Sequence, residues 1–215
     1  MADVRSKADK PPLAHVRKLP NGKWDEHFLD EHSHGVEKLA GKFAEYFNSA
    51  RPFKNDYGRT KGFTYEGGIR VPMIVSWPGR IKAGSRTDHI SAFWDVMPTI
   101  GELVKSEVPN DIDGISFLPT LMEYEGQTEH EFLYWEFPSY QGQQAVRLGD
   151  WKAIRKNIFK GNMTIELYNL KTDPTETIDV AAQNPEIVAK IETIMKTEHV
   201  PAELDRFKIK ELGDK

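Results

Sequence analysis

Four short segments of alternating apolar and polar residues constrain the fold of this chain more than any other feature. They occupy residues 132–137, 145–148, 151–155 and 165–170 and are separated by turn residues. Gly149-Asp150 joins the second and third segments, and such a two-residue connection is typical of a tight β-hairpin. Together these segments predict a small antiparallel sheet of about four strands.

One helix is expected to follow this sheet. Asn184 is a good residue for the position before a helix, Pro185 fits the first helical position, and Glu186 favours the positive end of the helix dipole. The apolar residues that recur at helical spacing are Ile187, Val188, Ile191, Ile194 and Met195. This helix can cover one face of the sheet, which gives a two-layer α+β unit.

Two further helices and one strand are expected earlier in the chain. Apolar residues at helical spacing predict an amphipathic helix over residues 36–47. A second helix is predicted from Asp95, as its capping residue, to Val104. Its expected buried face consists of Ile100, Leu103 and Val104. Residues 71–77 are a short apolar run rich in β-branched residues, which predicts a buried strand.

Composition and charge exclude several classes of protein. The chain has 215 residues, of which 39% are hydrophobic and 29% charged, as in an ordinary globular protein. Its net charge of −4 gives no reason to expect nucleic acid or an anionic membrane as a partner. No apolar run approaches membrane-spanning length, and residues 1–10 lack the apolar core of an export signal, so the compartment stays unknown. The absence of cysteine excludes disulfides and thiolate metal sites.

The most informative motif lies around residue 65. Lys61 stands four residues before Tyr65-Glu66-Gly67-Gly68-Ile69-Arg70-Val71-Pro72, and Trp77-Pro78-Gly79 follows. Further motifs come in this order: Asp95 with Pro98-Thr99, Asp113-Gly114-Ile115-Ser116, Leu148-Gly149-Asp150-Trp151-Lys152, Glu166-Leu167-Tyr168-Asn169-Leu170, Asp173-Pro174 and Glu176. This succession, from about residue 47 to 207, resembles the carboxy-terminal half of the sulfatases, alkaline-phosphatase-like enzymes that hydrolyse sulfate esters. Trp135-Glu136 and the segment 144–147 look like bacterial enzymes that act on sulfated sugars.

The resemblance implies an α/β fold in two parts. Residues 36–125 are expected to be a remnant of the sulfatase catalytic core, the tail end of an alkaline-phosphatase-like mixed sheet. Residues 126–215 are expected to form a small α+β subdomain with about four antiparallel strands and a carboxy-terminal helix. Residues 1–35 are rich in lysine and histidine and have few apolar anchors, which predicts a poorly packed segment.

Lys61 is the first candidate site residue. In sulfatases the lysine of this motif contacts the substrate sulfate, where a fixed ammonium group stabilises the developing negative charge by about 3 kcal/mol. The alternative is a solvated surface lysine. Gly67 and Gly68 are expected to allow a positive φ or a close backbone approach, or simply a turn. Glu66 and Arg70 are spaced for an ion pair that holds the loop, a role favoured over substrate contact.

A second group of candidates surrounds the loop between the first two predicted strands. Trp135, Glu136, Tyr140 and Gln143 carry aromatic and amide groups of the kind that recognise sugars. Arg147 suits a carboxylate or a second sulfate, and we expect it to bind substrate. Ordinary packing of Trp135 with a solvated rim around it is an equally open interpretation.

The nucleophile motif and the calcium motif of sulfatases have no intact counterpart at the places in the sequence where the family carries them. The family converts Cys or Ser in a C/S-x-P-x-R motif into formylglycine, and this motif lies upstream of the lysine motif. The pattern occurs here only at Ser76-Trp77-Pro78-Gly79-Arg80, after Lys61, so we expect no nucleophile from this chain. The family's Asp-Asn-Gly calcium motif would fall on residues 30–35, Asp-Glu-His-Ser-His-Gly, where imidazole is a poor calcium ligand. Calcium is therefore expected for the family but not bound by this chain alone. His27, His32 and His34 could bind a transition metal, but a solvated histidine-rich segment is favoured.

The resemblance thus predicts a sulfatase-family protein with aryl- or sugar-sulfate substrates. We expect the chain to be a carboxy-terminal portion that is inactive alone. Its expected partners are a sulfate ester or sulfated glycan, together with a complementing amino-terminal sulfatase half or a second copy of itself. The alternative function is a non-catalytic module that binds sulfated glycans through Lys61, Arg70 and the loop between Trp135 and Arg147.

Overall fold

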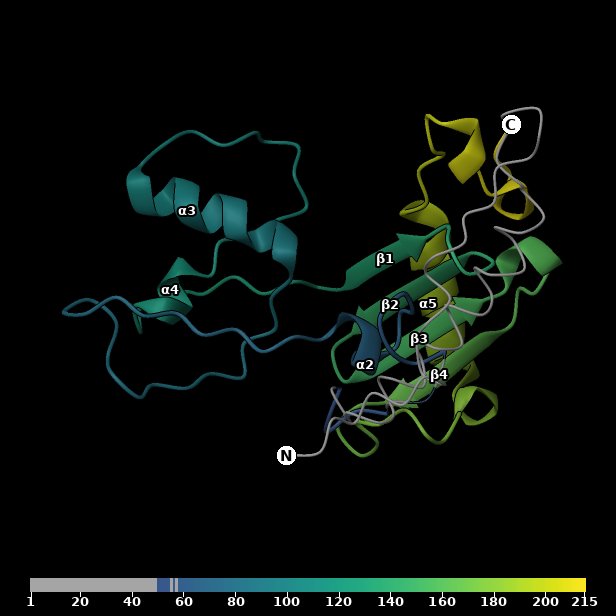
Figure 1. The fold of residues 1–215 in the computed structure, drawn as a ribbon, viewed down its shortest axis with the longest axis horizontal. Coiled ribbons are helices and arrows are strands. Elements are labelled where there is room, and N and C mark those ends of the chain that lie inside the picture. The colour runs from purple at the N-terminus through teal and green to yellow at the C-terminus, as the bar shows by residue number, and fades with distance from the viewer. Residues whose placement is uncertain (1–49, 55, 57) are drawn as a thin grey trace, which may run out of the picture.

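A computed structural model describes residues 50–54, 56 and 58–215. The predicted segment 1–35 and the predicted helix 36–47 lie outside these residues. The centre of the described structure is a four-stranded antiparallel sheet in the order β1-β2-β3-β4 (Figure 1). The strands are β1 Leu133–Phe137, β2 Gln143–Leu148, β3 Trp151–Lys156 and β4 Ile165–Asn169. All four predicted strands are confirmed.

The predicted hairpin at Gly149-Asp150 is confirmed as well. Leu148 pairs with Trp151 at the ends of β2 and β3, so only two residues form the connection. Gly149 has a φ of 57°, a left-handed conformation that costs little for glycine because it has no Cβ atom.

The helix α5, Pro185–Thr197, covers one face of the sheet (Figure 1). The strand alternation turns Val146, Ala153 and Leu167 toward it, where they form a buried cluster with Ile191 and Met195. The predicted apolar stripe of this helix is therefore confirmed. Asn184 precedes the helix as predicted, but its side chain donates a hydrogen bond to the carbonyl of Val180 at 2.9 Å and does not cap the helix.

The opposite face of the sheet carries the short helix α2, Glu66–Ile69. Tyr65, Ala145, Ile154 and Tyr168 form a second buried cluster between the sheet and this segment. The sheet is therefore covered on both faces, and the motif that contains Lys61 is packed directly against it. Short 3₁₀ turns complete this part: η2 Ile158–Lys160, η3 Ala181–Gln183, η4 Asp205–Phe207 and η5 Lys210–Leu212.

A second region lies beside the sheet and contains η1 Phe93–Asp95, α3 Val96–Val104 and α4 Leu118–Leu121 (Figure 1). The bounds of α3 agree with the predicted helix, but its predicted buried face does not. Ile100 is 52% exposed, and Leu103 and Val104 are also exposed. The buried residues of α3 are Pro98, Thr99 and Gly101, which pack toward the rest of this region.

The predicted buried strand at residues 71–77 is wrong for the described structure. The backbone there is irregular, and within the described residues it pairs with none of the four strands. A strand needs a neighbour to accept and donate its backbone hydrogen bonds, so without one no ladder forms. Its apolar side chains are exposed, and Ile74 is 94% exposed.

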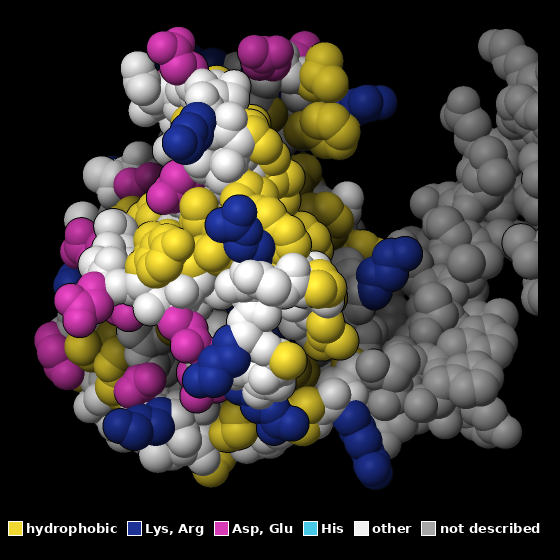
Figure 2. Space-filling view, turned by 90° about the vertical axis from the view of Figure 1, so that its left-hand side faces the viewer, with side chains coloured by type: hydrophobic (Ala, Val, Ile, Leu, Met, Phe, Trp, Pro, Cys, Tyr) yellow, Lys and Arg dark blue, Asp and Glu magenta, His cyan; other side chains and the backbone are white. Residues whose placement is uncertain are grey.

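These side chains and those of α3 make up an exposed surface that we call the apolar face. Figure 2 shows hydrophobic side chains gathered over this side of the molecule. The apolar face consists of Val71, Met73, Ile74, Val75, Trp77, Phe93, Val96, Met97, Ile100, Leu103 and Val104. None of the helices in the described part of the chain is long and apolar enough to span a bilayer.

Candidate functional site

Lys61 is exposed and lies in a turn that the sheet holds in place. The support is Gln143, the first residue of β2, whose side chain is buried. Its Nε2 donates to the carbonyl of Gly62 at 3.0 Å, and its Oε1 accepts from the backbone N–H of Thr64 at 3.2 Å. The backbone directly after Lys61 is therefore fixed by one buried amide.

Gly67 and Gly68 allow α2 to lie very close to the preceding backbone. A Cβ atom at Gly68 would lie 2.1 Å from the carbonyl oxygen of Phe63, and one at Gly67 would lie 2.6 Å from that of Lys54. The predicted close backbone approach is confirmed. Any side chain at either position would push α2 away from the segment that carries Lys61.

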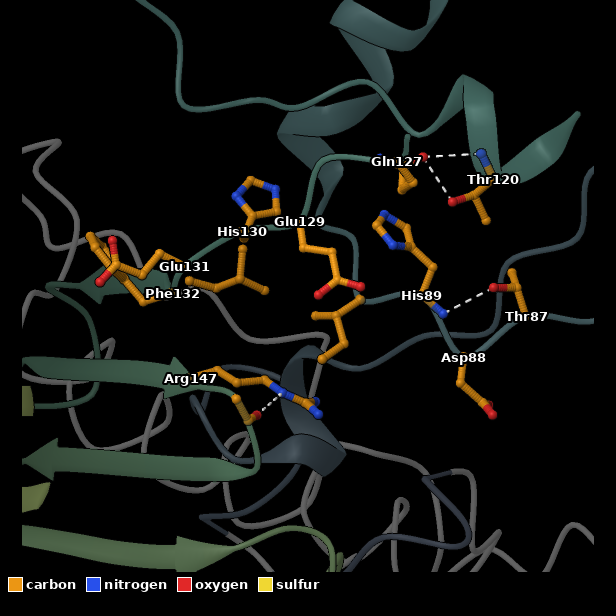
Figure 3. A pocket seen from close by; sticks show the side chains of 13 residues that line it. Thr87, Asp88, His89, Thr120, Gln127, Glu129, His130, Glu131, Phe132 and Arg147 are labelled. Carbon is orange, nitrogen blue, oxygen red and sulfur yellow. Dashed lines mark hydrogen bonds between the residues drawn. The ribbon is translucent and has the colours of Figure 1, made fainter. Parts of the chain in front are cut away.

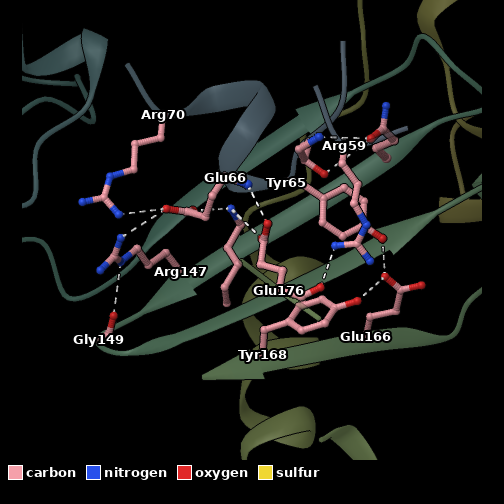
Figure 4. A network of polar contacts seen from close by, with 12 residues as sticks. Arg59, Tyr65, Glu66, Arg70, Arg147, Gly149, Glu166, Tyr168 and Glu176 are labelled. Atoms are coloured by element: carbon pink, nitrogen blue, oxygen red, sulfur yellow. Dashed lines mark hydrogen bonds and ion pairs between the residues drawn. The ribbon is translucent and has the colours of Figure 1, made fainter. Parts of the chain in front are cut away.

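The contact between α2 and the sheet is largely ionic. Arg147 and Lys152 lie directly opposite each other on β2 and β3, an arrangement of like charges that is unfavourable without a counterion. Glu66 supplies the counterion, because its Oε1 lies 2.9 Å from the Nζ of Lys152 and its Oε2 lies 3.9 Å from Arg147 (Figure 4). The predicted Glu66–Arg70 ion pair is also present, at 3.4 Å. Glu66 therefore holds three cations.

Glu176 adds a second carboxylate to this buried network. Its Oε2 accepts the backbone N–H of Glu66 at 2.8 Å, and its Oε1, 3.9 Å from Lys152, has no hydrogen-bond partner in the described structure. Burial raises the pKa of Glu176 to about 7. Burial also opposes ionisation of Glu66, but the neighbouring charge of Lys152 outweighs it and lowers the pKa of Glu66. Lys152 thus lies between a firmly ionised carboxylate and one that gains a proton near neutral pH.

Lys152 and Glu176 were not predicted as members of the site. Lys152 is fully buried, which a lysine tolerates only beside an acid. The strand alternation could have indicated it, because Lys152 and Ile154 share the inward face of β3. Glu176 lies in a loop without periodicity, so the sequence holds no comparable signal for it.

Arg147 also lines a pocket of about 390 Å³ at the end of β2 (Figure 3). Residues 87–90 and 129–133 form its walls, and the side chain of Arg147, which is 18% exposed, lies below them. Its Nε donates to the carbonyl of Gly149 at 3.2 Å. The volume lies in the range of pockets that bind small molecules.

Asp95 and His130 support one wall of this pocket. The Nε2 of His130 lies 2.9 Å from the Oδ1 of Asp95, which also accepts the N–H of Ile115 at 2.9 Å. The other carboxylate oxygen accepts the N–H of Ala92 at 2.6 Å. Asp95 immediately precedes α3, as predicted, but it makes no side-chain cap because these three groups occupy its carboxylate.

The structure places Lys61 and Arg147 at different parts of the sheet. Gln143, below the Lys61 turn, and Arg147 are four residues apart on β2, which corresponds to about 13 Å along the strand. Lys61 is not among the residues that line the pocket of Arg147. The two predicted substrate-binding residues therefore lie on one face of the sheet but do not share one cavity.

The other candidates around the β1–β2 loop are largely engaged inside the protein. Trp135 packs against Trp94 with ring centroids 5.8 Å apart, which agrees with the packing interpretation. Glu136 accepts from Tyr134, and its Oε2 lies 2.8 Å from the Nδ1 of His199. Tyr140 is half-buried at the loop.

The predicted calcium motif lies outside the described residues. Within residues 50–54, 56 and 58–215 there is no group of three His, Asp or Glu side chains placed to hold a metal ion. The expected motif at residues 30–35 and the histidines His27, His32 and His34 lie outside the described residues.

Several known proteins with sequences similar to this chain are sulfatases. The N-acetylglucosamine-6-O-sulfatase of Bacteroides thetaiotaomicron is 32% identical over 165 residues, which cover 69% of this chain and 29% of that protein. Human arylsulfatase A is 30% identical over 172 residues, which cover 67% of this chain and 33% of that protein. This chain therefore spans about a third or less of the length of these relatives.

Solved structures agree with the sequence comparisons. The crystal structure of Ps i-CgsB in complex with k-i-k-neocarrahexaose matches with a TM-score of 0.57 and 28% identity, covering 68% of this chain and 32% of that one. The fold is that of alkaline-phosphatase-like sulfatases, as predicted. The family model described as N-sulphoglucosamine sulphohydrolase, C-terminal, matches residues 57–201. Because this match covers well over half of the 215 residues, the chain belongs to that sulfatase family.

Proposed function

We propose that this chain supplies Lys61 as the sulfate-binding residue of an active site at which aryl- or sugar-sulfate esters are hydrolysed. The observation that carries this proposal is the turn of Lys61, which is exposed while Gln143 fixes the backbone beside it. A cation held in place before substrate arrives stabilises sulfate oxygens without reorganisation of the protein. The names of two relatives, an N-acetylglucosamine-6-O-sulfatase and an arylsulfatase, support both classes of ester.

Arg147 is proposed to bind a second anionic group of the same substrate, a carboxylate or a second sulfate. Arg70, Arg147 and Lys152 surround Glu66, and Glu176 is only partly ionised near neutral pH because of its raised pKa of about 7. Positive charge is therefore in excess around this network. The distance of about 13 Å along β2 suits a substrate longer than one sugar ring.

The nucleophile is expected to come from outside these 215 residues, because their one C/S-x-P-x-R match, Ser76-Trp77-Pro78-Gly79-Arg80, follows Lys61, whereas the family's nucleophile lies upstream of the lysine motif. We propose that an amino-terminal sulfatase half provides it, along with the calcium site, and packs on the apolar face. The exposure of this face and the share of the relatives that the chain spans support the proposal. The 215-residue chain alone is expected to show no turnover of 4-nitrophenyl sulfate with calcium. Turnover that Lys61→Ala abolishes would overturn this expectation.

Equilibrium binding tests the role of Lys61 directly. 4-Nitrophenyl sulfate is titrated into the wild type, Lys61→Ala and the control Lys190→Ala, which removes another exposed lysine, on α5. Loss of a charge-assisted contact should weaken binding about tenfold in Lys61→Ala and leave the control unchanged. Equal affinities of the two variants would reject the proposal.

A second candidate function is non-catalytic binding of sulfated glycans, favoured by the excess positive charge at Arg70 and Arg147. It predicts retention on a sulfated-polysaccharide column that falls with added salt and that Arg147→Ala weakens. No retention, or retention that Arg147→Ala leaves unchanged, would reject this function.

A further inference from the structure

The loop between β1 and β2 holds three consecutive residues in the left-handed region. The φ angles are 53° at Tyr140, 72° at Gln141 and 75° at Gly142. This conformation is unfavourable for residues with a side chain, and such strain concentrates at functional sites. Neighbouring backbone fixes it, because the carbonyl of Gln141 accepts the N–H of Phe159 at 3.0 Å and that of Gly142 accepts the N–H of Ile158 at 3.2 Å.

The ring of Tyr140 lies against the backbone next to Lys61. A Cβ atom at Gly62, whose φ is 93°, would lie 2.5 Å from the Cε2 of Tyr140, so a side chain there would be strained and would displace the ring. Phe63 and Phe137 support the ring, with centroids 4.8 and 6.3 Å from its own. Tyr140 is only half-buried, and Phe137 is exposed. A partly open aromatic surface therefore adjoins the turn that carries the proposed sulfate-binding lysine.

We propose that Tyr140 is a specificity-determining residue that stacks against the alcohol part of the sulfate ester. The inference rests on the proposed function of Lys61 and names the substrate class of that site: esters whose alcohol has a flat face. An aromatic ring and the C–H face of a pyranose both fit this description, whereas a small alkyl group does not. The ammonium group of Lys61 meets the sulfate, and the ring of Tyr140 meets the group attached to it.

A purely structural role predicts a different outcome. If the ring only supports the turn of Lys61, its removal weakens binding of every sulfate-containing ligand alike. If it stacks on the alcohol, its removal weakens only ligands with a flat face. Four probes separate these cases: inorganic sulfate, methyl sulfate, 4-nitrophenyl sulfate and glucosamine 6-sulfate.

The experiment measures the dissociation constants of these four probes for the wild type, Lys61→Ala, Tyr140→Phe and Tyr140→Asn. Asparagine tolerates the left-handed conformation at residue 140, so this variant removes the ring with little change in the loop. We expect Tyr140→Asn to weaken the two flat ligands about fivefold and to leave the other two within about twofold. Tyr140→Phe keeps the ring and should bind like the wild type. The flat probe that Tyr140→Asn weakens more identifies the natural class, aryl or sugar.

The outcomes keep the two proposals apart. Unchanged binding of all four probes by Lys61→Ala rejects the proposed function. If Lys61→Ala weakens all four but Tyr140→Asn affects all equally or none, the stacking role of Tyr140 is wrong and that of Lys61 stands. Saturation-transfer NMR on the wild type needs no variant. Saturation of the protein's aromatic protons leaves sugar protons unsaturated, so it should reach the ring protons of glucosamine 6-sulfate only through contact, and no transfer rejects stacking on a sugar.

Discussion

The sheet and the apolar face contain similar side chains and differ in what covers them. Val146, Leu167 and Ile191 are fully buried between the sheet and α5, because the sequence supplies both surfaces of that interface. Ile74 and Ile100 are equally apolar, but within the described residues no second surface covers them. An apolar pattern therefore specifies which residues are to be buried, and a matching surface decides whether they are.

The largest loss of stability is expected from breaking the ion pairs that join α2 to the sheet. Lys152→Met removes the cation that Glu66 and Glu176 share. The two buried carboxyl groups are then left with only the arginines as charged partners. Breaking a buried ion pair of this kind should lower the free energy of unfolding by about 4 kcal/mol. Urea denaturation measures it, with Lys190→Met on the exposed side of α5 as the control. A loss below about 1 kcal/mol would show that apolar packing alone holds this side of the sheet.

A matched pair of isoleucines tests the comparison itself. Ile191→Ala leaves a cavity in the cluster below α5 and should cost about 3 kcal/mol, whereas Ile100→Ala on α3 should cost less than about 1 kcal/mol. Thermal unfolding of both variants measures the difference. Equal losses would mean that the apolar face is covered in solution, for example by a second copy of the chain.

The protonation of Glu176 is expected to change the free energy of unfolding by a smaller amount that depends on pH. Its folded pKa of about 7 lies above the ordinary value of 4.5, so the folded chain holds a proton that the unfolded chain releases between these values. Stability contributed by this group therefore falls as the pH rises from 4.5 to 7. Glu176→Gln removes that loss. The unfolding free energy of the variant relative to the wild type should therefore be higher at pH 8 than at pH 4.5 by roughly 2 kcal/mol. A pH-independent difference between the two proteins would contradict the assignment.

The smallest change in stability is expected at Ile74, although association should change clearly. Ile74→Asp places a charge in the middle of exposed residues 71–77 and should leave the unfolding free energy within about 0.5 kcal/mol. It should reduce self-association and the binding of dyes that report exposed apolar surface. Sedimentation velocity of the wild type and the variant checks this. A wild type that is monomeric and binds no such dye would show that the apolar face is hidden.

The sequence predicted most of the fold where local patterns and their partners lie close together. The four strands, the Gly149-Asp150 turn and α5 follow from period-two and helical spacing over residues 132–197. The buried strand at residues 71–77 could not be checked against a partner from the sequence, and the exposed face of α3 was mistaken for its buried face for the same reason.

The candidate site was predicted less completely than the fold. The Glu66–Arg70 pair follows from helical spacing, but Lys152 and Glu176 lie 86 and 110 residues from Glu66 in the chain. Spacing along the sequence does not show such contacts. Likewise, the contact between Gly62 and Tyr140 depends on the left-handed loop, which no motif indicated. The substrate-binding roles of Lys61 and Arg147 stay predictions.

The amide of Gln143 makes the position of Lys61 depend on the alignment of the sheet. Gln143 and Ala145 point to the face of α2, whereas Gln144 and Val146 point to that of α5. A single inserted residue early in β2 would exchange these faces and turn the amide away from the Lys61 turn. Length changes within β2 are therefore expected to displace Lys61, even though the error in strand pairing touches no ligand.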